Sequence, residues 1–456
     1  MMYKSFPTVS HSDRINLAKT HMLNAKDFLR PEEVFKDDRI DDLRSFKIKY
    51  LLGEPVYEVT SLSGNIILKY AESGELIKIN SEIASKLAVQ ASNIKESFKV
   101  EVLKELDQWV PRTKFLKHLP IYAVHFNNEN NTRVYISSLN GDVQSLTTSS
   151  DRFWAWVGAI PHWIYFKDIR IQTSLWVQLV IWLSALGFIM ALTGVITGLA
   201  RYKKKPKANF RRFKNKWYNI HYYFGLMFGL FVCTWIFSGL MSMSPFDWTP
   251  STQLNKQEKI KWQGEDFTLN TLRGVNWNNF IEKSNNISCK EIGFELFNKE
   301  LFAKVYSNEN VKLIPLYTSN HTPKIEGYGS VIQSFNSSDG IINSIQLDEY
   351  DNYYYSRHND KVLPVIKITT TSNLAYYINP STTEMLYKCS NKNRIQRWLY
   401  SGLHSLDFSF LISNGALWDV VVIFLMVGGT IVSITATALG VKFIRRKIRK
   451  RIKKRK

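Results

Sequence analysis

The stretch RIQRWLYSGLHSLDF (residues 394–408) sets an arginine, a tryptophan and a histidine directly before a long apolar run. A related stretch, RFWAWVGAIPHWIYF (residues 152–166), precedes an earlier apolar run in the same way. His162 and His404 occupy the same position in the two stretches. A histidine that recurs at the same position of two related stretches predicts that the chain contains two copies of one unit.

Shifting the sequence against itself by 242 residues aligns the two halves without a gap and brings rare residue types together. The matching pairs include Arg152 and Arg394, Trp156 and Trp398, Phe166 and Phe408, Trp176 and Trp418, Gly187 and Gly429, and Thr193 and Thr435. Chance would not preserve tryptophan and histidine positions together. We therefore expect an internal duplication at an offset of 242.

Three apolar runs are long enough for membrane helices, which need roughly 20 apolar residues. They are residues 174–200, 217–243 and 415–441, and Asp419 is the only formal charge inside them. A buried helix of a soluble protein would seldom stay free of charge for so long. The sequence predicts three transmembrane helices.

The net charge of +21 is concentrated beside these runs. Residues 201–216 hold nine Lys or Arg and residues 442–456 hold eleven, with no acid in either segment. The rest of the chain is nearly neutral, so the basicity does not indicate nucleic acid. Short basic flanks favour the cytoplasmic side of a membrane. We expect a basic cytoplasmic loop at 201–216 and a basic cytoplasmic tail at 442–456.

The remaining segments then lie on the opposite, extracytoplasmic side. They are two domains, residues 1–151 and 244–393, each followed by an interfacial Arg-Trp-His stretch at 152–173 or 394–414.

Strand signals recur in both domains. β-rich runs separated by Gly- or Asn-containing turns occupy residues 53–79, 118–146, 298–320 and 362–386, and residues 80–106 have a helical pattern. We expect an α+β module, a helix on an antiparallel sheet, four times over.

The second unit opens with the span 217–243, whereas the first has no equivalent. Its counterpart would fall at about −25 to +1, and residues 1–23 contain no apolar core that could serve as a signal or anchor. The hypothesis is a mis-assigned start, a truncation, or a separately encoded helix that completes a four-span bundle.

These motifs resemble the PepSY-associated transmembrane proteins of bacteria. The resemblance rests on GEPVYEV (53–59), YISSLNGDV (135–143), HYYFGLMFGLF (221–231) and above all on RIQRWLYSGLHSLDF followed by ALWDVVVIFLMVGG (416–429). It implies an α-helical membrane bundle of four spans, three of them present here, with two α+β PepSY-type domains in the periplasm. It also implies an inner-membrane location, b-type haem held between the helices, and reduction of ferric iron or a ferric siderophore.

Three histidines are candidate ligands of the haem iron. His162 and His404 precede equivalent spans, and a pseudo-twofold relation would bring both imidazoles to one iron. His221 lies in the second span, with Gly225 and Gly229 clearing one helix face for a flat macrocycle, and it would serve a second haem. The alternative is that His162 and His404 only anchor interfacial helices within an aromatic belt, and that His221 is an interfacial residue near the cytoplasmic headgroups.

Other residues are weaker candidates for contact with a haem. Arg152 and Arg394 would pair with haem propionates or with lipid headgroups. Met241 and Met243 are poorer ligand candidates, because a methionine at a helix end more often packs.

The sequence also limits the route of electrons. It has no Cys-x-x-Cys-His, which excludes c-type attachment, and no nicotinamide- or flavin-binding motif. Electrons would come from a quinol or a separate reductase. Two other functions stay open: a haem-free PepSY protein that binds or inhibits peptidases, and an accessory of siderophore uptake. Whether Cys289 and Cys389 form a disulfide also stays open.

Overall fold

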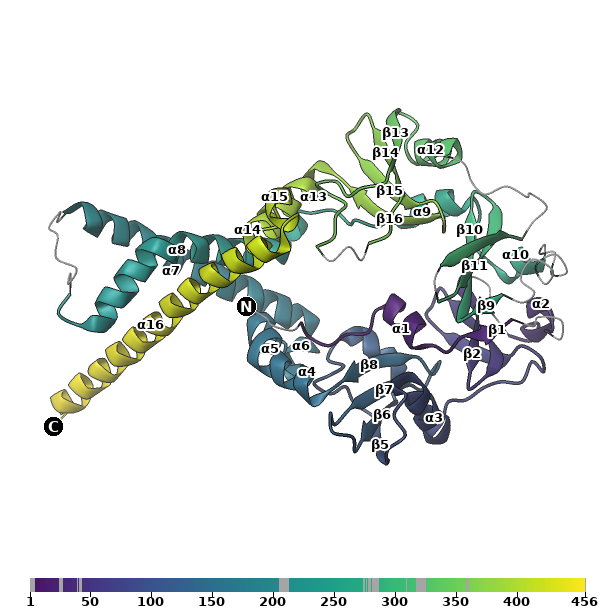
Figure 1. Cartoon of the computed structure of the whole chain (residues 1–456), viewed down its shortest axis with the longest axis horizontal. Coiled ribbons are helices and arrows are strands. Elements are labelled where there is room, and N and C mark those ends of the chain that lie inside the picture. Colours follow the sequence, from purple (N-terminus) through teal and green to yellow (C-terminus); the bar gives the residue numbers. More distant parts are fainter. Residues whose placement is uncertain are drawn as a thin grey trace.

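The computed structural model describes residues 5–23, 28–38, 40, 43–204, 213–273, 275, 277, 280, 287–308, 310–316, 325–357 and 361–455. Three long helices form one end of the molecule, and antiparallel sheets with short helices form the other (Figure 1). We call the second part the sheet region.

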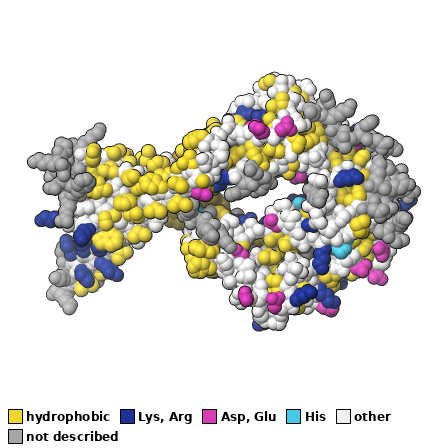
Figure 2. Space-filling model, in the orientation of Figure 1, with side chains coloured by type: hydrophobic (Ala, Val, Ile, Leu, Met, Phe, Trp, Pro, Cys, Tyr) yellow, Lys and Arg dark blue, Asp and Glu magenta, His cyan; other side chains and the backbone are white. Residues whose placement is uncertain are grey.

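The three long helices are α7 (Thr173–Lys204), α8 (Lys216–Ser242) and α16 (Gly415–Arg455). Each is long and apolar enough to cross a membrane. Figure 2 shows hydrophobic side chains covering this part of the surface and Lys and Arg side chains near the end far from the sheet region. The predicted spans 174–200, 217–243 and 415–441 agree closely with these helices.

The central helix of the three, α8, packs against both α7 and α16. Glycines allow this close approach: a Cβ on Gly229 would lie 3.1 Å from Val195 Cγ2 of α7. A Cβ on Gly429 of α16 would lie 3.2 Å from Trp235 Cζ3 of α8. Small residues at helix contacts are typical of membrane bundles, where close backbone packing replaces the hydrophobic effect.

The basic tail expected at 442–456 continues α16 as a helix to Arg455. Lys and Arg are good helix formers, and cations are favoured near a helix C-terminus, so nothing in this segment ends the helix earlier. Most of the basic loop 201–216 lies outside the described residues.

Four antiparallel meanders make up the sheet region. The strands are β2 (Leu43–Leu51), β3 (Glu54–Ser61), β4 (Ile66–Tyr70), β5 (Phe98–Leu103), β6 (Ile121–Phe126), β7 (Arg133–Ser137), β8 (Val143–Thr147), β10 (Glu291–Phe297), β11 (Glu300–Tyr306), β12 (Val311–Pro315), β13 (Ile341–Leu347), β14 (Val365–Thr370), β15 (Ala375–Asn379) and β16 (Glu384–Cys389). A two-stranded ribbon pairs β1 (His21–Met22) with β9 (Ser288–Cys289).

One sheet joins the two halves of the chain. Its six strands run in the order β12-β11-β10-β2-β3-β4, and the central pair β2 and β10 is antiparallel, with Phe46 opposite Phe294. The segments expected as separate domains, 1–151 and 244–393, therefore share a continuous sheet. Two four-stranded sheets, β5–β8 and β13–β16, flank it and lead back to the long helices (Figure 1).

Short helices cover these sheets. They are α1 (His11–Leu17), α2 (Pro31–Val34), α3 (Ser81–Ser92), α9 (Lys256–Gln263), α10 (Leu269–Arg273) and α12 (Ile325–Phe335). Of these, α3 packs on the β5–β8 sheet, and α9 packs with α12 beside β10.

The helix expected over 80–106 is shorter than predicted. It ends at Ser92, because Asn93 takes the left-handed conformation (φ 54°), which Asn tolerates and which stops a helix. Residues 98–103 form strand β5 instead.

The sequence left open whether Cys289 and Cys389 form a disulfide, and the structure shows none between them. Cys289 and Cys389 are both free and buried, each in a different hydrophobic core.

The spacing of 242 residues between matching elements holds only in part. It relates β7 to β15 and every later element up to α7 and α16. Earlier elements differ, since 246 residues separate Glu54, which begins β3, from Glu300, which begins β11. The two halves therefore do not align without a gap; for example, residues 127–132 join β6 to β7, whereas only residues 371–374 join β14 to β15.

Candidate functional site: two histidines at the junction of helices and sheets

Two matching segments connect the sheets to the long helices. The first comprises α4 (Ser149–Trp154), a π-helical turn, α5 (Ile160–Trp163) and α6 (Lys167–Arg170). The second comprises α13 (Asn391–Gln396), a π-helical turn, α14 (Leu403–Ser405) and α15 (Ser409–Ile412). Both begin with a capping box, in which the side chain of Thr148 or Ser390 accepts a backbone N–H three residues on.

A sharp turn follows each histidine. Ile164 and Leu406 adopt left-handed backbone conformations, with φ of 53° and 56°. Such a conformation is strained for a side chain branched at Cβ, as in isoleucine, and is kept only where the surroundings impose it. The turn reverses the chain between the histidine-bearing helix and the long helix that follows.

A tryptophan holds each turn in place. Trp176 Nε1 donates a hydrogen bond to the carbonyl oxygen of Trp163 (2.8 Å). Trp418 Nε1 donates to the carbonyl oxygen of Ser405 (3.0 Å). These bonds tie the first turn of α7 and of α16 to the residue next to each histidine, so both histidines are fixed relative to the bundle.

The two histidines meet. The ring centroids of His162 and His404 are 6.1 Å apart, and the ring planes are inclined by 52°. The structure thus brings together the two residues that the sequence matched.

Helix α8 orients the ring of His404. His404 Nδ1 lies 3.0 Å from Ser238 Oγ and 3.2 Å from the carbonyl oxygen of Trp235. Ser238 Oγ itself donates to that carbonyl (3.0 Å), so its oxygen is left to accept from the imidazole. Both neighbours are therefore acceptors and Nδ1 carries the proton. Nε2 keeps its lone pair, which is the arrangement of a metal-binding imidazole.

Burial disfavours the charged form of both rings. Burial lowers the pKa of His162 below its ordinary value, and the neighbouring His404 lowers it further. Burial also lowers the pKa of His404, against a smaller opposing effect of the hydrogen bond to Trp235. A neutral imidazole is the form that binds a metal.

A cavity of about 380 Å³ adjoins the pair; we call it the histidine cavity. Its walls are largely aromatic and include Trp163, Trp176, Trp235 and Tyr400. Gly239 has no side chain, which leaves space beside His404. A Cβ at this position would lie 3.7 Å from His404 Cε1. The volume is within the range of small-molecule sites.

Two buried donors on this cavity have no acceptor. Arg112 Nε and Trp235 Nε1 are buried and lack a hydrogen-bond partner among the described residues. An unsatisfied buried donor costs about 1–3 kcal/mol, so both groups carry a cost that their described neighbours do not offset. The guanidinium of Arg112 also lies 5.9 Å from the Tyr165 ring, on the same cavity.

These features fit a haem iron with two imidazole ligands. Metal–imidazole bonds of about 2 Å on opposite sides of one iron place the two ring centres about 6 Å apart. Among the described residues, no group of three or more His, Cys, Asp or Glu is suited to a metal ion. Arg112 would face an anionic propionate.

The third predicted ligand, His221, lies elsewhere in the bundle. Its Nδ1 is 3.0 Å from Thr435 Oγ1 of α16. Thr435 donates to the carbonyl oxygen of Ile431 (2.7 Å), so its oxygen accepts from Nδ1 and His221 Nε2 is left as an acceptor. Gly225 has open space around it, as predicted, whereas Gly229 is close to α7.

The predicted arginines lie away from the histidine cavity. Arg152 donates to Thr147 Oγ1 (2.9 Å) and to the carbonyl oxygen of Asn131 (2.8 Å), closing the end of strand β8. Arg394 donates to Asn391 Oδ1 (2.8 Å) and stacks over Tyr353. Met243, which the sequence marks as a weaker candidate for a haem ligand, lines the cavity.

Sequence reasoning missed the other cavity residues. Trp235, Ser238 and Gly239 lie three and four residues apart, so they share one face of α8, and that spacing could have singled them out. Arg112 has no comparable signal. It lies before β7, where the spacing of 242 no longer relates the two halves, so the repeat does not identify a counterpart for it.

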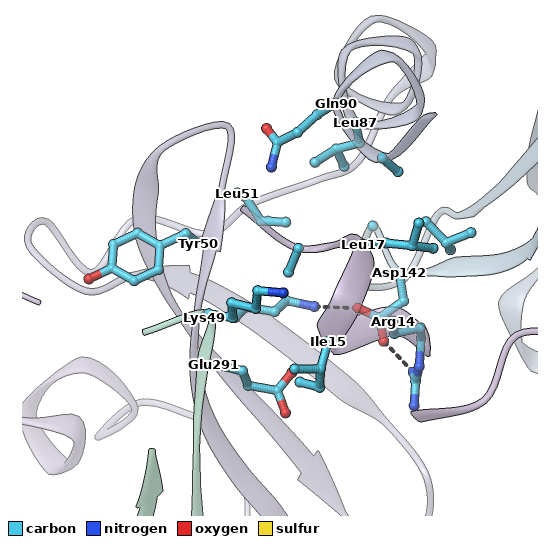
Figure 3. A pocket seen from close by; sticks show the side chains of 15 residues that line it. Arg14, Ile15, Leu17, Lys49, Tyr50, Leu51, Leu87, Gln90, Asp142 and Glu291 are labelled. Atoms are coloured by element: carbon cyan, nitrogen blue, oxygen red, sulfur yellow. Dashed lines mark hydrogen bonds and ion pairs between the residues drawn. The ribbon is translucent and has the colours of Figure 1, made fainter. Parts of the chain in front are cut away.

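A second group of charged residues lies in the sheet region (Figure 3). Lys49 Nζ contacts Asp142 Oδ1 (2.8 Å) and Glu58 Oε2 (2.5 Å), and Arg14 Nη1 contacts Asp142 Oδ2 (2.7 Å). Burial alone would raise the pKa of Asp142, but Lys49 and Arg14 hold it well below its ordinary value. The adjoining cavity of about 80 Å³ is too small for most ligands, so this group ties α1 to the sheets.

No protein-family model, curated protein or solved structure matches this chain, and its function is therefore argued from its own residues.

Proposed function

We propose that the protein is a haem-containing electron-transfer protein of the bacterial inner membrane that reduces ferric iron, free or chelated by a siderophore, in the periplasm. The observation that carries the proposal is the meeting of His162 and His404, whose rings lie 6.1 Å apart beside a cavity with unsatisfied donors. In this proposal the four meanders are PepSY-type modules and the chain is an internal duplication.

The same proposal assigns an orientation. The basic segments 201–216 and 442–456 lie in the cytoplasm, and the sheet region lies in the periplasm. The histidine cavity is then at the periplasmic end of the bundle, because it adjoins the last turns of α8 and the start of α7.

The chain's own residues would have distinct tasks. His162 and His404 would hold a b-type haem, which would supply one-electron chemistry. Trp235 O and Ser238 Oγ hold the His404 tautomer, the aromatic walls exclude water, and Arg112 balances a propionate. His221 offers one axial nitrogen for a second haem. Electrons arrive from a quinol or a separate reductase.

The test is a reduced-minus-oxidised absorption spectrum of the purified full-length protein, combined with haem extraction. We expect a b-type spectrum in the wild type and in His125→Ala, since His125 lies in strand β6 of the sheet region. His404→Ala should lose one haem per chain, seen as a lower haem content and a smaller difference spectrum. A featureless wild-type spectrum would favour the haem-free alternatives, a PepSY binding or peptidase-inhibiting protein or an uptake accessory.

A further inference from the structure

A second cavity, of about 520 Å³, lies next to the histidine cavity. The two share one residue, Tyr400, which lines both. The Tyr400 ring stacks on His404, with centroids 5.2 Å apart and planes inclined by 24°. A ligand in the second cavity would therefore touch the ring that covers one of the paired histidines. We call this second cavity the tyrosine cavity, because Tyr353, Tyr355, Tyr387 and Tyr400 line it.

Arg397 is the most unusual residue of the tyrosine cavity. It is only 7% exposed, and its Nε and Nη2 donate to the carbonyl oxygens of Asn352 (2.7 Å) and Asp407 (2.6 Å). Its Nη1 is buried without a hydrogen-bond partner among the described residues. The guanidinium also lies 4.5 Å from the Tyr355 ring and 4.1 Å from the Trp398 ring, so a fixed positive charge is held in the aromatic wall of the cavity.

The charge of the tyrosine cavity favours an anion. Arg357, Lys361 and Arg397 line it, against one acid, Asp407. Asp407 is already engaged: it is 3% exposed, accepts from Tyr355 OH (2.8 Å) and lies 3.2 Å from Arg357 Nε. Among the described residues that line the cavity, the net balance is therefore two positive charges.

The matching segment of the first half has none of this. At a spacing of 242 residues, Arg397 corresponds to Ala155, Tyr400 to Gly158 and Asp407 to Tyr165. Both segments nevertheless form the same sequence of short helices and turns. The arginine, the tyrosine and the aspartate are thus not needed for the shared framework, and their presence in one copy indicates a task specific to that copy.

We infer that the tyrosine cavity binds an anionic, aryl-bearing chelate of ferric iron, of the catecholate class, attracted by the positive charge of Arg357, Lys361 and Arg397. The four tyrosines of the lining offer aromatic contacts to an aryl ligand, and guanidinium groups attract both its charge and its π-system. The inference rests on the proposed function, since it names the electron acceptor and where it binds.

The experiment is equilibrium dialysis of the full-length protein in detergent against ferric tris(2,3-dihydroxybenzoate), read by the absorption of the complex itself. We expect saturable binding at one site per chain. Arg397→Gln should weaken it roughly ten- to hundredfold, the usual effect of losing a hydrogen bond to a charged group. Lys392→Gln removes a positive charge from the exposed face of the same connecting segment and should bind like the wild type.

Further variants make the outcome decisive if Arg397→Gln does not fold. Lys361→Gln changes an exposed cation of the cavity and should weaken binding by a smaller factor. Equal affinity of the wild type and Lys361→Gln, or equal binding of ferric citrate, which has no aryl group, would overturn the inference. His162 lines only the histidine cavity, so His162→Ala should retain chelate binding even if haem is lost. The result for this variant therefore separates failure of the proposed function from failure of this inference.

Discussion

The imidazole rings of His162 and His404, 242 residues apart in the sequence, lie 6.1 Å apart in the structure. Each histidine occupies the same place in its connecting segment, followed by a left-handed residue and a tryptophan hydrogen bond to the chain. A single histidine at a helix end would have little functional meaning. Two that are matched in sequence and paired in space, beside a cavity with unsatisfied donors, support a shared ligand.

Filling the histidine cavity should prevent haem binding while leaving the bundle intact. Gly239→Val would place methyl groups next to His404 Cε1, since a Cβ alone already lies 3.7 Å away. Overpacking of a site typically costs 1–3 kcal/mol, so we expect haem retention to fall roughly tenfold. Gly194→Val on α7, where nothing lies within 4 Å of the added Cβ, is the matched control and should retain haem. Normal haem content in Gly239→Val would argue against this site.

Replacing Arg112 by glutamine should weaken haem binding, whereas the same replacement of Arg152 should not. Arg112→Gln removes the cation with the unsatisfied Nε on the histidine cavity, so haem should be lost on dialysis roughly ten times more readily than from the wild type. Arg152→Gln should behave like the wild type, because its guanidinium closes a strand end. The reverse result would restore the role that the sequence suggested for Arg152.

The charged group around Lys49 should make a large contribution to stability. Lys49→Met leaves Glu58 and Asp142 buried without their shared cation, and breaking a buried ion pair costs about 3–5 kcal/mol. We expect a clearly lower thermal unfolding midpoint of the sheet region, followed by circular dichroism. Lys86→Met, which disrupts an exposed helical pair with Glu82, should leave that midpoint unchanged. Equal midpoints for the two variants would show that the buried group is not a structural tie.

Stability should fall in mild acid partly through His118. Burial, with a smaller effect of Lys117, lowers the pKa of His118 from its ordinary value of 6.5 to about 4 in the fold. Between these values the unfolded chain binds a proton that the folded chain does not, so acidification favours unfolding. His118→Gln should flatten the decline of the unfolding midpoint between pH 6.5 and pH 4. An unchanged slope would mean that other groups cause the decline.

Long-range patterning made the membrane helices and the histidine pair predictable. Apolar runs of sufficient length defined α7, α8 and α16, and the match of His162 with His404 anticipated their meeting. Helix position follows from local composition, and a duplicated unit tends to place equivalent residues near a common axis.

The joining of the two halves was not predictable. The pairing of β2 with β10 depends on which strand edges meet in the folded chain, and alternating side chains do not specify a partner strand. Cavity residues such as Arg112 and Tyr400 were missed for a related reason. Their role comes from the tertiary position of an otherwise ordinary residue, and the repeat, which identified the histidines, does not extend to them.

The most direct test of the central claim, that His162 and His404 hold one haem together, compares the haem content and difference spectra of His162→Ala, His404→Ala and the double variant. Both single variants and the double variant should lose the same amount, one haem per chain, because each removes a ligand of the same iron. If the wild type contained no haem, or if the double variant lost twice as much as either single variant, the two histidines would not share a haem and the claim would be wrong.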